Sequence, residues 1–296
     1  MRSDWLESFL VFSDTLNFTR AAEELHISQP ALHVKISKLS EYVGKPLYHK
    51  SGRNLLLTAE GQQLQAFARD QSEQAASFLQ ILRNGSAVQD VCLSAGEGTF
   101  LYLLGDAISA FMSRSSHKLR IRTGTQSDVV KDVLSGEAHV GITPLDSVNE
   151  SLACRPYSEV GQMLVMPAAH PLASKRKVGL KSLNGERLIV PSENRPHRIL
   201  INRLLMDLKV DWNVSVEVDS WELMLNFVKH GMGLAIVNEY CQIPDELVAK
   251  PLPEFPVIQF QLIKRRHASD RWAVNELEAA LIEHKDHWKN ERKKCQ

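Results

Sequence analysis

The sequence of 296 residues has few of the features that mark metal proteins, secreted proteins and membrane proteins. Its four cysteines are scattered without a Cys-x-x-Cys pair, which argues against both a metal site and a disulfide framework. No stretch approaches the roughly 18 consecutive apolar residues of a membrane span, and the first residues lack the apolar run of a signal peptide. We therefore expect a cytoplasmic location, no membrane contact, and reduced thiols at Cys92, Cys154, Cys241 and Cys295.

Signatures of catalysis and of cofactor binding are also missing. The sequence has no glycine-rich phosphate loop, no Ser/His/Asp arrangement and no pair of acids at a usable spacing. One close histidine pair, His284 and His287, falls in a polar basic tail and is more simply explained as a frayed end than as a metal site. We expect no catalytic residues, no metal and no cofactor.

The net charge does not indicate a nucleic-acid binder, because 35 basic residues balance 35 acidic ones. The distribution is more informative than the sum. Between residues 26 and 53 one acid, Glu41, faces five bases, while the acids of the N-terminal region lie mostly upstream. A locally basic face suits modest attraction to DNA phosphates, although a plain solvated surface would be the alternative without a DNA-binding motif.

Such a motif follows directly from the local signals of residues 18–39. Residues 18–25 and 29–39 are typical of two short helices joined by the turn 26–28, with Thr19 as a plausible N-cap of the first. Ser28 caps the second helix and Pro30 lies in its first turn. Leu32, Ile36, Leu39 and Val43 form its buried stripe. This arrangement places a helix in the major groove of DNA.

The opposite side of the second helix carries the residues expected to read bases. Gln29 can bond adenine bidentately and Val34 can contact a thymine methyl. Residues 47–49 and 54–57 predict a two-stranded wing, whose tip Lys50-Ser-Gly-Arg53 can enter a minor groove or bind phosphate. The expected DNA-binding residues are Thr19, Arg20, Ser28, Gln29, Pro30, His33, Val34, Lys35, Ser37, Lys38, Lys50 and Arg53.

A long helix is expected from Thr58 to about Arg83, ended by Asn84-Gly85. Apolar residues recur along it at alternating steps of four and three, which gives a seam of period 3.5. Such a seam must pack on the chain's own domains or on another chain. The seam residues are Leu64, Phe67, Ala68, Gln71, Ala75, Phe78 and Leu82.

Beyond residue 90, strands and helices alternate, which favours an α/β domain. We expect helices over 100–112, 127–134, 221–231 and 271–283. The expected strands are 91–95, 119–122, 140–142, 163–166, 188–191, 214–218, 233–237 and 258–263.

The segment 9–61 resembles the DNA-binding domain of LysR-type transcriptional regulators. The resemblance is carried by 21–25, 27–31, Ile36, Leu39, Gly44, Leu47, 57–58 and Gly61. His170-Pro-Leu-Ala173 and 231–237 resemble the effector-binding domain of the same regulators. The sequence departs from the family pattern at His33, Val34, Ser40, Tyr48, Lys50 and His139.

The resemblance implies an N-terminal all-α winged helix-turn-helix and a long linker helix, followed by a two-lobed α/β effector domain like a periplasmic binding protein. The implied domains are 1–60, 58–85 and 90–296, with lobe I about 90–160 and 264–290 and lobe II about 162–263. Expected partners are double-stranded promoter DNA, a small-molecule effector and a second copy in a homodimer or homotetramer, with RNA polymerase as a further candidate.

An effector between the lobes would meet strand ends and helix N-termini, where free N–H groups favour an anion. Thr99 is the strongest candidate, and Arg195, His197 and Arg198 could attract a carboxylate. Ordinary capping is the alternative for each of the other candidates, which are Thr125, Ser127, Ser192, Asn194 and Asn238.

Two other functions remain open on the sequence. One is a transcription regulator without a natural ligand, which works by dimerisation alone. The other is a small-molecule binding protein whose N-terminal helices mediate protein contacts, although such a protein would not need Gln29-Pro30 and a basic wing.

Overall fold

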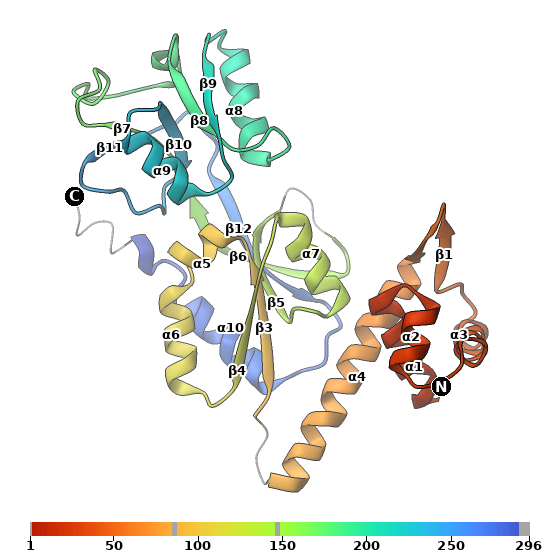
Figure 1. The fold of residues 1–296 in the computed structure, drawn as a ribbon. Helices are drawn as coiled ribbons and strands as arrows, with labels where there is room; N and C mark the ends of the chain where they lie inside the picture. Colours follow the sequence, from red (N-terminus) through yellow and green to blue (C-terminus); the bar gives the residue numbers. More distant parts are fainter. Residues whose placement is uncertain (1, 85–87, 146–148, 290–296) are drawn as a thin grey trace. The chain divides into compact units, whose positions relative to one another are not determined.

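The computed structural model describes residues 2–84, 88–145 and 149–289 (Figure 1). The chain forms two compact units. The first comprises Met1–Gly96, Ile108–Arg155 and Gln261–Leu281, and the second comprises Glu97–Ala107, Pro156–Phe260 and Ile282–Gln296. Residues 97–107, expected in lobe I, therefore cluster with the second unit. Gly85 and the linker after it lie outside the described residues.

The N-terminal part of the first unit is a helical domain with a small hairpin. Its core is formed by fully buried Phe9, Phe12, Leu32 and Leu39. The predicted stripe of α3 is confirmed for Leu32, Ile36 and Leu39 and wrong for Val43, which lies at the last residue of the helix and is 38% exposed. Its elements are α1 (Ser3–Thr15), α2 (Phe18–Glu24), α3 (Gln29–Val43), β1 (Tyr48–Ser51) and β2 (Asn54–Leu57).

The predicted caps in this domain are correct at α3 and wrong at α2. Ser28 accepts the Ala31 N–H, and Gly44 ends α3 with φ 75°. The cap of α2 is Asn17, whose side chain accepts the N–H groups of Thr19 and Arg20. Thr19 cannot be the cap because it already lies inside the helix, whereas Asn17 has the extended backbone that a cap needs.

The long helix α4 (Ala59–Asn84) begins where expected. The Thr58 hydroxyl accepts the Gly61 N–H and donates to the Pro46 carbonyl. Only glycine fits at position 61, because the Cβ of any other residue would overlap the Leu47 carbonyl oxygen. Helix α4 therefore begins in direct backbone contact with the segment that leads into the wing.

The first α/β sheet has the strand order β4-β3-β5-β12-β6, in which β3 pairs in parallel with both β4 and β5. The single helix expected over 100–112 is instead two helices, and the break lets the adjacent Leu103 and Leu104 both be buried. The strands are β3 (Asp90–Ala95), β4 (Lys118–Thr123), β5 (Val140–Pro144), β6 (Leu152–Val160) and β12 (Ile258–Arg265). The helices are α5 (Glu97–Tyr102), α6 (Gly105–Arg114), α7 (Gln126–Ser135) and α10 (Trp272–His284).

The second sheet has the order β11-β7-β10-β8-β9. Strand β8 is parallel to β9 and β10, whereas β7 runs antiparallel to β10 and β11. Its strands are β7 (Gln162–Pro167), β8 (Arg187–Val190), β9 (Asn213–Glu217), β10 (Leu234–Asn238) and β11 (Leu247–Pro251). Helices α8 (Pro196–Asp207) and α9 (Trp221–Lys229) and the 3-10 turn η1 (Leu180–Leu183) belong to the same unit.

Within the described ranges, no helix is both long and apolar enough to cross a membrane. The same ranges contain no cluster of three or more histidine, cysteine, aspartate or glutamate side chains that could bind a metal ion.

Candidate DNA interface and effector site

Helix α3 presents a polar face opposite its buried stripe. Gln29, Ser37 and Lys38 are exposed, and Val34 is 52% exposed. The Thr19 hydroxyl donates to the Gln29 side-chain oxygen at 3.4 Å, which leaves the amide NH2 group of Gln29 available to a base. The structure therefore brings Thr19 of α2 against Gln29 at the start of α3.

Two predicted residues lie at the flanks of this face. The His33 ring stacks on Phe18, with centroids 3.6 Å apart and planes 14° apart, so its orientation is set by α2. Lys35 extends to α1, where its ammonium donates to Ser8 Oγ at 3.2 Å and lies 3.8 Å from Asp4. We therefore correct the expectation for Lys35, because its charge is directed to α1 and away from the base-reading face.

The wing is a regular antiparallel hairpin whose register runs from Tyr48 opposite Leu57 to Ser51 opposite Asn54. Its two-residue turn consists of Gly52, with φ 60°, and Arg53. A positive φ at this turn suits glycine. Lys50 and Arg53 are exposed at the tip, as the sequence predicted.

Helix α4 has one packed face and one exposed apolar face. Ala68 is buried, and Leu64 packs on the core of the helical domain, so neither is available to a second chain. This corrects the predicted seam at these two positions, where the chain's own domains occupy the surface. The other seam residues are exposed, as are two apolar neighbours, and the exposed set is Phe67, Gln71, Ala75, Phe78, Leu79, Ile81 and Leu82.

The packed face of α4 carries acids paired with two arginines of the first unit, one in β12 and one just before α10. Asp70 pairs with Arg265, and both side chains are 10% exposed. Glu73 pairs with Arg271 and lies 3.0 Å from His139 Nε2. Burial raises the pKa of Glu73, but hydrogen bonding to His139 and the charges of His139, Arg271 and Arg69 outweigh it, so the net pKa is lowered. Helix α4 is therefore held to this part of the first unit by buried charges.

His139, one of the departures from the family pattern, is part of that contact. Its Nδ1 accepts the Cys92 N–H at 2.9 Å, so in the neutral ring the proton is on Nε2, which faces Glu73. His139 thus connects β3 to α4.

In the second unit, α5 packs on two aromatic side chains. A Cβ on Gly98 would lie 2.7 Å from Trp221 Cδ1 and 3.2 Å from the Tyr240 hydroxyl. Thr99 is buried beside it. Asn238 accepts from Gln162 Nε2 at 2.7 Å and donates to the Tyr240 hydroxyl at 2.6 Å. Both α5 and Asn238 therefore contact Tyr240.

Three of the remaining effector candidates make local contacts. Thr125 is the N-cap of α7 in a capping box with Asp128, and Ser127 Oγ lies 2.9 Å from Thr125 Oγ1. Both belong to the first unit. Ser192 is half-buried and donates its N–H to Asp219 at 2.9 Å, while Asn194 is exposed. The capping alternative is therefore correct for Thr125.

The basic residues expected to attract a carboxylate are also occupied. Arg195 pairs with Asp219 at 2.9 Å, and this hydrogen bond lowers the pKa of Asp219. Arg198 is buried, donates to the Pro191 carbonyl and to Asn202, and lies over the Trp212 ring. Burial lowers the pKa of His197 to about 4, so its ring is neutral near pH 7.

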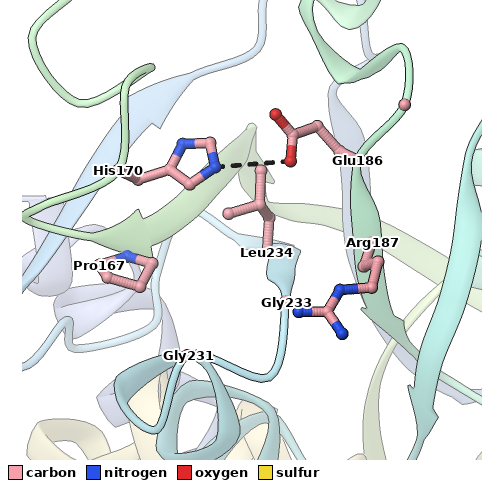
Figure 2. A pocket seen from close by; sticks show the side chains of 8 residues that line it. Pro167, His170, Glu186, Arg187, Gly231, Gly233 and Leu234 are labelled. Carbon is pink, nitrogen blue, oxygen red and sulfur yellow. Dashed lines mark ion pairs between the residues drawn. The ribbon is translucent and has the colours of Figure 1, made fainter.

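A separate small pocket lies at the other end of the second sheet, where β8 and β10 begin (Figure 2). His170 Nε2 is 3.4 Å from the Glu186 carboxylate, and its Nδ1 accepts the Leu172 N–H. None of the predicted effector residues lines this pocket, whose lining residues are Pro167, His170, Gly185, Glu186, Arg187, Gly231, Gly233 and Leu234.

A winged helix-turn-helix joined by a long helix to a domain with two α/β sheets defines a class of ligand-responsive DNA-binding regulators. Comparison with known families agrees. Residues 3–62 match the model of the bacterial regulatory helix-turn-helix protein, lysR family, and residues 84–286 match that of the LysR substrate binding domain. The chain belongs to the LysR family of transcriptional regulators, which confirms the predicted fold class, DNA-binding function and effector-binding domain.

Individual relatives are distant. The chain is 25% identical to the transcriptional activator CmpR of Synechocystis sp., over 87% of this chain and 85% of CmpR. It is 28% identical to the uncharacterized regulator YbhD of Escherichia coli, over 94% and 90% of the two chains. A full-length OxyR variant of Pseudomonas aeruginosa has the same fold, with TM-score 0.70, 21% identity and coverage of 95% and 94%. CbnR bound to its target DNA gives TM-score 0.56, 17% identity and coverage of 97% and 100%.

Proposed function

We propose that α3 reads promoter DNA with the side chains on its exposed face. A fully buried stripe on one side of a helix and a polar, exposed opposite side is the observation that carries this proposal. Gln29, Val34 and Ser37 contact base edges, while Lys38 contacts phosphate. Ser28 and Pro30 set the start of the helix, and His33 lies at its edge against Phe18.

The surrounding elements provide backbone contacts. Thr19 and Arg20 at the start of α2 are exposed next to Gln29 and can bond phosphate oxygens. Lys50 and Arg53 at the wing tip enter the adjacent groove. These contacts fix the register of α3 on the duplex and carry no sequence information themselves.

We also propose that the exposed apolar face of α4 packs against the same face of α4 in a second chain. Phe78 is 60% and Leu82 is 66% exposed, and apolar side chains of this size form a continuous surface along the C-terminal half of the helix. A self-complementary surface produces a twofold dimer, which places two reading helices on two half-sites. A homotetramer requires a further interface of the α/β domain.

In this proposal the effector binds in the second unit at the carboxyl ends of β8 and β10, where Ser192 follows β8 and Asn238 ends β10. Binding changes the placement of the reading helices. Such coupling requires tighter binding to one arrangement than to another. We further propose that the chain acts in the cytoplasm and catalyses no reaction, since one matched family model describes a regulatory DNA-binding protein and the other a binding domain.

The DNA proposal is tested by fluorescence anisotropy on duplexes from the promoter beside the chain's own gene. Gln29→Ala should weaken specific binding about 5- to 150-fold and leave binding to random duplex unchanged. Arg53→Ala should weaken both and reduce the slope of log affinity against log salt by about one. Gln62→Ala, an exposed glutamine on α4, is the matched control. Unchanged specific affinity of Gln29→Ala contradicts the assignment.

A regulator without a natural ligand is the second candidate, because Trp221 and Tyr240 fill the space beside Gly98. Thermal-shift screening separates the two. A flat response to amines, amino acids and organic acids supports the second candidate, whereas stabilisation by one class supports the first.

A further inference from the structure

The charges near α5 do not suit the anionic effector expected from the sequence. Arg195, His197 and Arg198 are the basic residues at the start of α8, in the same unit. The first is paired with Asp219, the second is held neutral by burial, and the third is buried against Trp212 and the Pro191 carbonyl. None of these three presents a positive charge to a ligand.

Acids stand at both helix starts instead. Glu97 is in the first turn of α5 and Glu222 is in the first turn of α9, and both are exposed. Burial is the main cause of the raised pKa of Tyr102, followed by the charge of Cys241 and then by those of Glu222 and Glu97, so both carboxylates lie close enough to act on this side chain. Carboxylates here oppose the positive helix ends that would otherwise attract an anion.

Aromatic rings lie near these acids. The rings of Tyr102 and Tyr240 stack with centroids 5.6 Å apart. The Trp221 ring and the Tyr240 hydroxyl both pack against Gly98. Tyr102 and Trp221 are half-buried, so each keeps ring surface open to a ligand. A ring face is electrically negative and attracts a cation.

Two unsatisfied atoms nearby are both acceptors. His197 donates through Nε2 to the Ile236 carbonyl, and its neutral, buried Nδ1 has no partner within the described ranges. Its ring stands edge-on to Trp221, with centroids 5.0 Å apart. The buried Gln162 Oε1 also lacks a partner there, at the far end of the hydrogen-bond chain through Asn238 to Tyr240. Buried acceptors without partners favour a ligand that brings N–H donors.

We propose that this end of the second unit binds a cationic organic amine. The ammonium group lies on the faces of Tyr102 and Trp221, with Glu97 and Glu222 as its counter-charges. This inference rests on the proposed effector role of the unit and specifies the charge class of the ligand. A carboxylate in the same place would meet two carboxylates and negative ring faces.

The test compares two ligands of similar size and opposite charge on the full-length chain. Phenethylamine and 3-phenylpropionate are titrated by calorimetry and by thermal shift at pH 7.5 and low salt. We expect phenethylamine to bind at least 10-fold more tightly than 3-phenylpropionate. Glu222→Gln and Trp221→Leu should each weaken amine binding about 10-fold, and Asp207→Asn, an exposed acid at the end of α8, should not. Glu222→Gln keeps the test valid if Trp221→Leu fails to fold.

Three results overturn the proposal. The first is tighter binding of 3-phenylpropionate than of phenethylamine, and the second is amine binding that Glu222→Gln leaves unchanged. The third is no binding of phenethylamine, putrescine or agmatine at 10 mM, a concentration on the order of ten times a millimolar dissociation constant. Promoter binding is measured on the same samples. Stabilisation by the carboxylate alone keeps the effector role and rejects only the charge class. No response to any ligand, with intact promoter binding, rejects the effector role as well.

Discussion

The buried pair between Asp70 of α4 and Arg265 of β12 makes a quantitative prediction about how the long helix is held. Asp70→Asn removes one charge and leaves the Arg265 guanidinium 90% covered; among the described residues, its other side-chain hydrogen bond goes to the Val133 carbonyl. Removing one member of a buried pair costs about 3–5 kcal/mol, and the remaining carbonyl bond places the expectation at the lower end, about 3 kcal/mol. For a chain of this size that corresponds to a fall in Tm of about 6–12 °C.

The measurement is urea and thermal unfolding followed by far-UV circular dichroism. The control is Asp4→Asn, which breaks an exposed pair with Arg2 and should cost less than about 1 kcal/mol. Replacing both partners, as Asp70→Leu with Arg265→Met, should recover most of the loss, because no uncompensated charge then remains buried. Equal shifts for Asp70→Asn and Asp4→Asn would refute the reasoning, as would a double variant no better than the single one.

Two further predictions concern α4 and the second unit. Phe78→Asp should convert the proposed oligomer to a monomer, as measured by light scattering after size exclusion. Met206→Asp, at an exposed position on α8, is the control and should leave the molar mass of the oligomer unchanged. An unchanged molar mass for Phe78→Asp rules out the α4 interface. Because the folded pKa of His197 is about 4 and the unfolded value is about 6.5, the unfolded chain binds the extra proton, so stability falls as pH drops from 6.5 towards 4. The loss should be on the order of 2–3 kcal/mol in urea titrations at the two ends of this range, and His197→Gln should reduce it; an equal pH slope in both proteins would contradict the assignment.

The helical domain could be predicted almost residue by residue because its signals are local. Ser28, Gly44 and the apolar stripe of α3 all act within a few residues of their own positions. The mistaken cap at Thr19 shows the limit of such signals, because Asn17 and Thr19 are both good capping residues and lie two positions apart. Which one serves depends on where the chain leaves α1.

The candidate sites were harder to predict because they depend on contacts between distant segments. Lys35 is directed to Ser8 by the packing of α3 on α1, and the pairing of Asp70 with Arg265 joins residues 195 positions apart. The charge balance near α5 likewise could not be read from the sequence. It depends on Arg195 reaching Asp219 and on the burial of His197, which no local pattern records.

Gly61 has a consequence for promoter architecture. Its close approach to the Leu47 carbonyl leaves no room for a side chain, so the start of α4 and the base of the wing cannot shift independently at this point. In a twofold pair joined along α4, the distance between the two major-groove helices is then fixed by how the paired helices cross. For such a pair, we expect the number of base pairs between the two halves of an operator to depend on the residues that set this crossing.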